Sequence, residues 1–540
     1  IRDRTYVVFG KTNSSLVQLS AVATGVGGFA INGFMLTDYS GWSSAGIGDV
    51  NGDGLADLLV GALYDDTRWL RTNAGASYVV FGKSTGTAVD VSAVAAGNGG
   101  FVIYGQGNGD QLGFQVNGAG DVNGDGLADV IVGAPYSDPA AGDAAGRSYV
   151  IFGKTGTDAI QLSAFTSGGF VINGQGASDN SGFGVSSAGD MNGDGLGDLL
   201  VYSIGANATA GADAGRRYVV FGKANNTAVD LSAIANGVGG FVINGQAASD
   251  YADRDSIAYA GDVNGDGLSD LVMGTFADRT YVMFGKTTNT AVDFSALAAG
   301  NGGFVINGEK VTVGAVLGDY SGTCVGYAGD VNGDGLADLI IGAYFADPSD
   351  PKVDAGRTYI VFGKTNNTAI NLSSVAQGNG GFVVDGESAY DYSGFRVSAA
   401  GDVNGDGLAD LMVGAINKDY GAATDAGRTY VIFGSTNGAF TESKVDQLGT
   451  SAVDNLTDSG TAQTMVAGAG DDSLTATAAS VLYGGAGNDT FVIGSTMITA
   501  LRSTMGNGGN TQHLSRIDGG SGVDTIQLSG SGLTLDLTSI

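Results

Sequence analysis

Short apolar runs bounded by glycine, asparagine and aspartate recur along most of the chain, and they predict β-strands. Four kinds of segment can be distinguished, typified by residues 395–400, 410–415, 430–434 and 302–308. They are rich in β-branched and aromatic residues, and continuous apolar runs such as residues 58–60 suit strands that are buried on both faces. The pattern therefore predicts units of four short antiparallel strands.

These units repeat, with 63 to 78 residues between successive copies of the third segment. Small antiparallel sheets repeated in this way are typical of β-propellers. The third segment, which reads Tyr-Val-Val-Phe-Gly or nearly so, begins at Tyr6, Tyr78, Tyr149, Tyr218, Tyr281, Tyr359 and Tyr430.

The blade count follows from how often each segment occurs. The third segment occurs seven times, whereas the fourth occurs six times clearly, with a degenerate seventh copy at residues 438–440. We predict an all-β fold with a seven-bladed propeller whose first blade lacks its first two strands. The alternative is six blades, with the N-terminal strands completing the last blade. The clear copies of the fourth segment are marked by Phe29, Phe101, Phe170, Phe241, Phe304 and Phe382.

An acidic nonapeptide, Asp-Val-Asn-Gly-Asp-Gly-Leu-Ala-Asp or nearly so, lies between the first and second segments in six units. Oxygen-bearing side chains at positions 1, 3, 5 and 9, with glycines at 4 and 6, are how a short loop wraps a hard cation, and Ca²⁺ is the ion we predict. A simple turn would not require aspartate at positions 1, 5 and 9 in every copy. The predicted side-chain ligands are Asp49, Asn51, Asp53 and Asp57; Asp121, Asn123, Asp125 and Asp129; Asp190, Asn192, Asp194 and Asp198; Asp262, Asn264, Asp266 and Asp270; Asp330, Asn332, Asp334 and Asp338; and Asp402, Asn404, Asp406 and Asp410.

The composition indicates that the acidic residues lie in loops and act as metal ligands rather than forming acidic helices. The 540 residues include 96 glycines, and 55 acidic residues outnumber 24 basic ones, giving a formal net charge of −31. Only Glu309, Glu387 and Glu442 are glutamates, so nearly all acids are aspartates, which favour turns. The charge argues against nucleic acid as a partner. The single cysteine, Cys324, excludes an internal disulfide framework, and no apolar run is long enough to span a membrane.

Residues 1–440 resemble FG-GAP repeats, the units of integrin α-subunit propellers. Phe152-Gly153 and Gly133-Ala134-Pro135 show the two motifs that name the repeat. The resemblance implies seven blades, and it implies that the nonapeptide is a calcium loop between the first two strands of a blade. It also implies that position 7 of each loop donates its backbone carbonyl, which assigns Leu55, Leu127, Leu196, Leu268, Leu336 and Leu408.

The last 100 residues, 441–540, show a different glycine pattern at residues 468–474, 485–491 and 520–526. It resembles the RTX (hemolysin-type) calcium-binding repeat, which implies a parallel β-roll with metal ligands at Asp472, Asp489 and Asp524. The copies are not tandem, so we expect three short β turns holding one or two ions rather than a regular roll. We also expect the natural protein to extend beyond both ends of the chain. RTX resemblance implies type I secretion to the outside of the cell or the bacterial cell surface.

Other candidate residues favour structural roles. Arginine precedes the third-segment tyrosine by two residues in six of seven units, and we expect it to pair with an aspartate or stack on an aromatic ring rather than form an anion-binding ring. Tyrosines of the Asp-Tyr-Ser-Gly stretches are expected to pack between blades. Cys324 is expected to be a buried thiol, and His513 is too isolated in sequence for a catalytic set.

These observations predict a secreted calcium-binding propeller that acts in adhesion, in binding or in structural assembly, without enzymatic activity. Its expected partner is an extracellular protein or glycan, or further copies of itself. The alternatives are a lectin and a polysaccharide lyase or hydrolase. An enzyme would need unlike residues that break the repeat, and Glu309 and Asp253 are the candidates.

Overall fold

The structure of the protein is a computed structural model. It describes residues 3–11, 13–35, 37–66, 71–206, 215–245, 256–309, 318–332, 334–348, 352–403, 409–419, 426–434, 445–450, 452–501, 515–521 and 523–535. Two compact units are distinguished, one formed by Ile1–Phe9, Ser15–Ala258 and Lys286–Leu297, the other by Gly10–Ser14, Tyr259–Gly285 and Ala298–Ile540.

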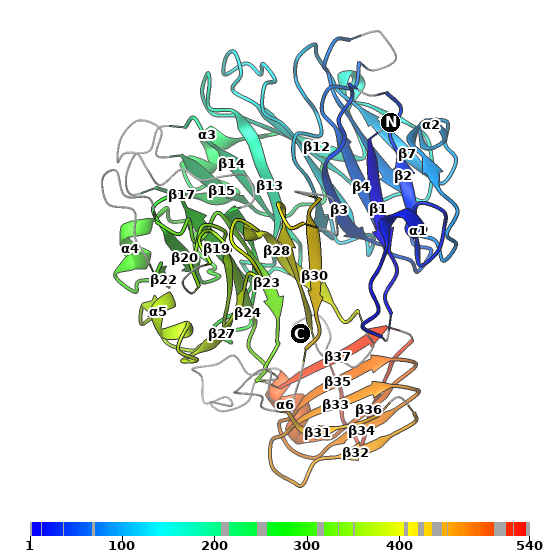
Figure 1. The fold of residues 1–540 in the computed structure, drawn as a ribbon, viewed down its shortest axis with the longest axis vertical. Coiled ribbons are helices and arrows are strands. Elements are labelled where there is room, and N and C mark those ends of the chain that lie inside the picture. Colours follow the sequence, from blue (N-terminus) through cyan, green and yellow to red (C-terminus); the bar gives the residue numbers. More distant parts are fainter. Residues whose placement is uncertain are drawn as a thin grey trace. The chain divides into compact units, whose positions relative to one another are not determined.

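The chain forms a seven-bladed β-propeller, as the repeat count predicts (Figure 1). We number the blades by their sheets: β1-β2-β6 is blade 1, β3-β4-β5-β7-β11 blade 2, β8-β9-β10-β12-β16 blade 3 and β13-β14-β15-β17-β21 blade 4. Blade 5 is β18-β19-β20-β22-β26, blade 6 is β23-β24-β25-β27, and blade 7 is β28-β29-β30.

In blades 2 to 7 the first strand ends immediately before the acidic loop, at a glycine. Its pairing with the second strand shifts register where the loop begins, for example between Gly46 and Gly48. The first strands are β3 (Ser40–Gly48), β8 (Val116–Gly120), β13 (Ser181–Gly189), β18 (Ile257–Gly261), β23 (Cys324–Gly329) and β28 (Ser393–Gly401).

The second strand begins at the last aspartate of the acidic loop and is almost entirely buried, as its continuous apolar sequence predicts. These strands are β4 (Asp57–Ala62), β9 (Asp129–Ala134), β14 (Asp198–Ser203), β19 (Asp270–Thr275), β24 (Asp338–Ala343) and β29 (Asp410–Ala415).

The third strand runs antiparallel to the second and ends just before Phe-Gly. The third strands are β1 (Arg4–Val8), β5 (Ala76–Val80), β10 (Arg147–Ile151), β15 (Arg216–Val220), β20 (Arg279–Met283), β25 (Arg357–Val361) and β30 (Arg428–Ile432).

The fourth strand pairs with the third along its whole length, so that the first residue of one faces the last residue of the other. The fourth strands are β2 (Gly28–Asn32), β7 (Gly100–Tyr104), β12 (Gly169–Asn173), β17 (Gly240–Asn244), β22 (Gly303–Asn307) and β27 (Gly381–Asp385). The predicted seventh copy, at residues 438–440, lies outside the described residues.

Among the described residues, five blades carry an additional two-residue strand, here called the fifth strand, that the sequence does not predict. It pairs in parallel with the fourth strand but comes from the connection between the third and fourth strands of the following blade, so it ties consecutive blades together. These strands are β6 (Val89–Asp90), β11 (Ile160–Gln161), β16 (Val229–Asp230), β21 (Val292–Asp293) and β26 (Ile370–Asn371).

A single helical turn follows each fifth strand, and one such turn also precedes β2. Each buries one or two apolar residues against its blade. The turns are α1 (Leu19–Val22), α2 (Val91–Val94), the 3₁₀ turn η1 (Leu162–Ala164), α3 (Leu231–Ala235), α4 (Phe294–Ala298) and α5 (Leu372–Val375).

The N-terminal strands form their own sheet rather than completing blade 7, which decides against the six-blade alternative. β1 pairs with β2, and the described part of blade 7 contains only β28, β29 and β30. The N–H of Lys11 donates to the carbonyl of Val403 (3.0 Å). In blade 3 the equivalent Lys154 donates in the same way to Val50 of the preceding blade.

The C-terminal segment forms a β-roll of two parallel four-stranded sheets (orange to red in Figure 1), more regular than we expected. Gly468, Gly485 and Gly520 stack in register, so the glycine motifs align despite their uneven spacing. The 35-residue step is absorbed between β36 and β37, where α6 (Ser495–Leu501) lies. The roll strands are β31 (Val445–Leu448), β33 (Thr464–Ala469), β35 (Val481–Ala486) and β37 (Arg516–Ser521) in one sheet, and β32 (Asn455–Thr457), β34 (Ser473–Ala476), β36 (Thr490–Ile493) and β38 (Thr525–Leu528) in the other.

Candidate metal centres

Each acidic loop is a tight curl closed by hydrogen bonds to its own backbone. In blade 2, Gly52 and Gly54 have φ of 77° and 84°, a left-handed conformation that glycine adopts without strain. This curl lets the Asp49 carboxylate accept N–H bonds from Gly52 (2.7 Å) and Gly54 (2.7 Å). Asn51 and Asp53 face the same curl, since the Asn51 amide donates to the Asp53 carboxylate (3.0 Å).

The aspartate at position 9 also has a structural role, which the sequence analysis did not predict. Asp129 is fully buried, and its two oxygens accept the N–H groups of Val122 (2.8 Å), at position 2 of the loop, and Gly153 (2.7 Å), in Phe-Gly. It therefore ties the loop to the end of the third strand. The same pair of bonds occurs in the other loops, at Asp57, Asp198, Asp270, Asp338 and Asp410.

The predicted ligands at positions 1, 3, 5 and 9 lie on one curl in blades 2 to 6, and position 7 donates its N–H to the position 5 carboxylate, as Leu55 does to Asp53 (2.9 Å). In blade 7, Asp402 and Asp410 are described, whereas Asn404, Asp406 and Leu408 lie outside the described residues. Within the described part of the chain, no three acidic, histidine or cysteine side chains converge into a ready-made metal cage.

The electrostatics of these loops disfavour the ionisation of buried aspartates. Burial, together with repulsion from the acids at positions 1 and 5, raises the pKa of Asp129 and of Asp198 to about 7. Burial also raises the pKa of Asp262 to about 6, with a contribution from Asp266. Carboxylates that resist ionisation because of like-charged neighbours are stabilised by a bound cation. An all-oxygen donor set of this kind fits Ca²⁺.

The loops of blades 5 and 6 are more enclosed than those of blades 2 and 3. Asp49 is half-buried and Asp53 is exposed, whereas Asp330 and Asn332 are 5% and 2% exposed. One cause is Tyr483 on β35 of the roll, whose hydroxyl donates to the Asp330 carboxylate. Through this contact, a strand of the roll reaches the acidic loop of blade 6.

The roll contains a column of stacked aspartates. The N–H of Asp454 donates to Asp472 (2.7 Å), that of Asp472 to Asp489 (2.8 Å), and that of Asp489 to Asp524 (2.9 Å). The second carboxylate oxygens of Asp472 and Asp489 are buried without a hydrogen-bond partner. Burial and neighbouring acids raise the pKa of both. The three predicted RTX-like residues therefore share one column.

Sequence reasoning missed the fourth member of this column. Asp454 follows Gly449 at the spacing that separates Gly484 from Asp489, but the intervening glycines are absent. A Cβ on Gly484 would lie 2.3 Å from an oxygen of Asp489, which explains why this spacing keeps a glycine. The spacing between Gly449 and Asp454 could therefore have identified Asp454 as the first member of the column.

The repeated arginines are structural, as expected. Arg357 pairs with Asp385 (2.6 Å) and lies over the ring of Tyr359 (5.8 Å), as predicted, whereas Arg147 has amide partners. Arg147 donates to Asn173 (3.2 Å) on the fourth strand of its own blade and to Gln106 (3.2 Å) from the preceding blade. Gln106 also accepts the hydroxyl of Tyr149 (2.7 Å). Such bonds lock neighbouring blades together.

Glu309, a candidate for the enzyme alternative, follows the fourth strand of blade 5 and faces blade 6 as Gln106 faces blade 3. It accepts from Arg357 (2.9 Å) and from the hydroxyl of Tyr359 (2.7 Å). This repeats the pattern of the other blades and gives Glu309 a structural role. Asp253 and His513 lie outside the described residues.

Two further expectations concern packing. Cys324 is buried and exchanges weak hydrogen bonds with the backbone of Val397, which confirms the buried thiol. Tyr392 of blade 7 packs against Tyr344 and Phe345 of blade 6, with ring centroids 6.3 and 5.3 Å away, which confirms packing between blades for this tyrosine. Tyr320 contacts the same two rings within its own blade.

Comparison with known proteins agrees with this architecture. Four segments, residues 41–80, 115–151, 326–361 and 393–432, match the FG-GAP repeat. They span the first three strands of blades 2, 3, 6 and 7. These matches, together with the relatives below, support an integrin-alpha-like β-propeller.

Similar curated proteins are integrin alpha chains. The chain is 35% identical over 130 residues to integrin alpha-PS2 of Drosophila melanogaster, which covers 23% of this chain and 8% of that protein. It is 32% identical over 195 residues to integrin alpha pat-2 of Caenorhabditis elegans (34% and 14%) and 31% identical over 128 residues to integrin alpha-IIb of Mus musculus (23% and 11%). The matches thus span less than a sixth of each relative. Within the described residues, no helix is long and apolar enough to cross a membrane.

Proposed function

We propose that this chain is a calcium-stabilised β-propeller module that acts outside the cell in adhesion, ligand binding or structural assembly. The observation that carries the proposal is the repetition of one all-oxygen loop in six blades, in which a buried position 9 carboxylate is repelled by other acids of its own loop. Extracellular calcium modules bind at about 10⁻⁴ to 10⁻³ M, which calcium outside cells reaches. Metal binding would be coupled to folding after export, for which we propose type I secretion.

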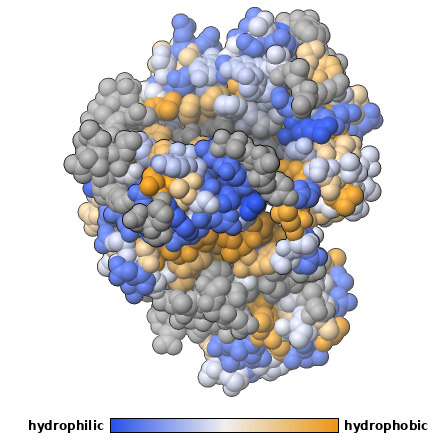
Figure 2. Space-filling model, in the orientation of Figure 1, coloured by the Kyte–Doolittle hydropathy of each residue, from blue (hydrophilic) through white to orange (hydrophobic). Residues whose placement is uncertain are grey.

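The binding role is supported by the similarity to integrin alpha chains and by the surface. Hydrophilic side chains cover wide areas of the face shown in Figure 2, interrupted by apolar areas. With a net charge of −31, the chain suits partners that are basic or that share calcium with it.

The test is a binding screen of the purified protein at about 1 mM Ca²⁺, with immobilised matrix proteins and a glycan array as probes. Sedimentation velocity would be measured in parallel. The proposal predicts saturable binding or self-association that is lost in excess EDTA. Incubation with acidic and neutral polysaccharides tests the enzyme alternative. Release of reducing ends or unsaturated products would contradict a non-enzymatic role.

A further inference from the structure

Blade 1 lacks the strand that pairs with one side of the third strand in the other blades. In blades 2 to 7 the third strand pairs with the second strand, as β5 pairs with β4 in blade 2. In the part of the chain that the structure describes, β1 pairs only with β2. The backbone N–H and C=O groups along the other side of β1 therefore form an open sheet edge.

The side chain of Val8, at the end of β1, shows what this edge lacks. It is 45% exposed, whereas the residue at the same position in blades 2 to 6 is at most 1% exposed. The residues compared are Val80, Ile151, Val220, Met283 and Val361. Each of them lies opposite a leucine or valine of the second strand, as Val80 lies opposite Leu58. Val8 is therefore exposed because no second strand covers it.

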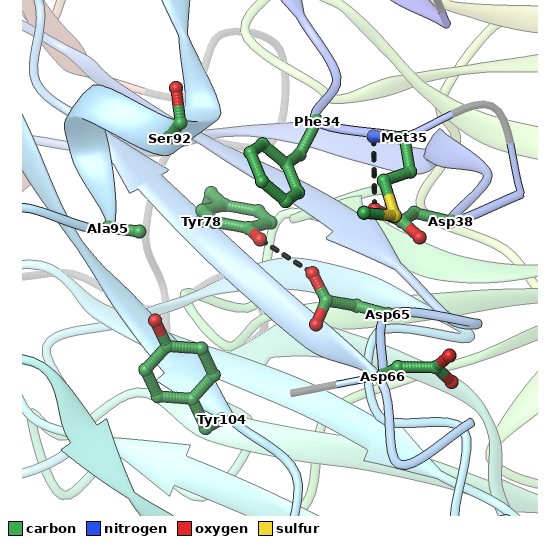
Figure 3. Close-up of a pocket in the computed structure, with 9 residues that line it drawn as sticks. All are labelled: Phe34, Met35, Asp38, Asp65, Asp66, Tyr78, Ser92, Ala95 and Tyr104. Carbon is green, nitrogen blue, oxygen red and sulfur yellow. Dashed lines mark hydrogen bonds between the residues drawn. The ribbon is translucent and has the colours of Figure 1, made fainter. Parts of the chain in front are cut away.

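Two groups that other blades bind through the missing element are also present in blade 1. In blade 2 the hydroxyl of Tyr78 donates to Asp65, three residues beyond the end of the second strand (2.7 Å; Figure 3). In blades 2 to 7 the N–H of the Phe-Gly glycine donates to the position 9 aspartate of the acidic loop, at 2.7 to 2.9 Å. Blade 1 keeps the corresponding Tyr6 and Gly10, but it has neither a second strand nor an acidic loop among the residues described.

Blade 7, which belongs to the other compact unit, has an uncovered face of its own. In blade 3 the side chains of Ile131 and Val150 are fully buried, because they pack against the first and second strands of blade 4. Their counterparts in blade 7, Met412 and Val431, are 37% and 45% exposed. The described pairs of first and second strands all belong to blades 2 to 7, so none remains to cover this face. The same element, a first and a second strand, is therefore missing in both units.

The acceptor edge of blade 1 is formed without the missing strands. β1 pairs with β2 over five residues in full register, from Arg4 opposite Asn32 to Val8 opposite Gly28. β2 is paired in turn with β6 on its other side. Because this edge is already ordered, it loses little conformational entropy when it takes up a further strand. Addition of a strand to an exposed sheet edge is a general mode of polypeptide recognition.

We propose that β1 binds a β-hairpin of the repeat's own first-and-second-strand type, carried by a separate polypeptide. The second strand of the hairpin runs antiparallel to β1 and covers Val8, and the last aspartate of its acidic loop accepts the N–H of Gly10. A second copy of this chain cannot supply the hairpin without losing a blade, because its described pairs of first and second strands are already part of sheets. The inference goes beyond the proposed adhesive function, and neither depends on the other.

The test is titration of the full chain, kept in about 1 mM Ca²⁺, into a fluorescent peptide with the sequence of residues 40–62, which form β3, the acidic loop and β4. The matched control is the same peptide with Leu59→Pro, because proline removes a ladder hydrogen bond from the second strand and leaves the acidic loop intact. Fluorescence anisotropy should show saturable binding of the first peptide and at least about tenfold weaker binding of the control. Absence of binding, or equal binding of the two peptides, would overturn the proposal.

Variants of the chain locate the binding site. Val8→Asp changes a side chain that is exposed in the free chain and becomes buried under the hairpin, so it should weaken peptide binding about tenfold or more and leave the melting temperature of the free chain nearly unchanged. Val238→Asp makes the same change in blade 4, at a residue that is 65% exposed, and should leave binding unchanged. Bound peptide should also slow amide hydrogen exchange in β1. If Val8→Asp binds the peptide like the parent chain, the hairpin binds elsewhere and the proposal fails.

Discussion

At the scale of single residues, the aspartate at position 9 and its neighbour at position 5 have separable roles. Asp129 accepts two backbone N–H groups in a buried site, whereas Asp125 lies on the exposed part of the loop. We expect Asp129→Asn to destabilise the protein by about 1–3 kcal/mol even in EDTA, because an amide nitrogen would face an N–H donor. Asp125→Asn should cost stability only in Ca²⁺. Urea unfolding in both conditions measures the difference, and equal losses in EDTA would contradict it.

The raised pKa values also predict an unusual pH dependence. An acid whose pKa in the folded state is above its ordinary value of 3.8 favours the folded state while it is protonated. Asp129 and Asp198 (about 7) and Asp262 (about 6) therefore predict that stability in EDTA falls as pH rises from about 4 to about 7. In Ca²⁺ the trend should reverse, since the ion binds ionised carboxylates. Calorimetric melting temperatures across this range test both signs.

Residue roles were only partly predictable from sequence. The loop ligands stand out because aspartate recurs at fixed positions. The bond between Asp129 and Gly153 spans 24 residues, so no local pattern reveals it. The interblade bonds of Arg147 were equally hidden, because Gln106 lies 41 residues away and belongs to another blade.

At the scale of elements, the glycine of the Phe-Gly turn allows neighbouring blades to pack closely. A Cβ on Gly153 would lie 2.6 Å from the Cβ of Leu127 and 2.9 Å from the carbonyl oxygen of Val50. Gly153→Ala should therefore destabilise by about 1–3 kcal/mol through overpacking. Gly156→Ala, three residues on and with open space around it, should stay within about 0.5 kcal/mol of the parent. Indistinguishable denaturation midpoints for the two variants would refute this role.

The sequence predicted the four long strands of a blade because hydrophobic runs of five or six residues carry a clear signal. It could not predict fifth strands such as Val89–Asp90, which are too short to show periodicity. In the roll, uneven spacing argued against regular stacking. The structure nevertheless keeps the register between β35 and β37, which begins only at Arg516.

At the scale of the whole molecule, the roll and the acidic loop of blade 6 are joined by Tyr483 and Asp330. Because this bond is buried and its acceptor is a carboxylate, Tyr483→Phe should cost about 1.5–3 kcal/mol. We expect faster amide hydrogen exchange in the blade 6 loop and in β35, with the loop of blade 2 unaffected. Tyr136→Phe, at a partly exposed tyrosine, is the matched control. Unchanged exchange in the blade 6 loop would show that the contact carries no stability.

The blade count is the global property that sequence gave most directly, since seven copies of the third strand outnumber six acidic loops. The enclosure of the blade 6 loop could not be foreseen, because all six loops have nearly the same sequence. It depends on Tyr483, which belongs to a segment with a different repeat.

The most direct test of the central claim is equilibrium dialysis of EDTA-stripped protein against Ca²⁺, with bound ions counted per chain and circular dichroism recorded at each point. The account predicts about six ions for the propeller loops and one or two more for the aspartate column of the roll, with β-structure gained or stabilised as they bind. The account would be contradicted if no Ca²⁺ bound and if the β-structure and the melting temperature were the same in EDTA as in Ca²⁺.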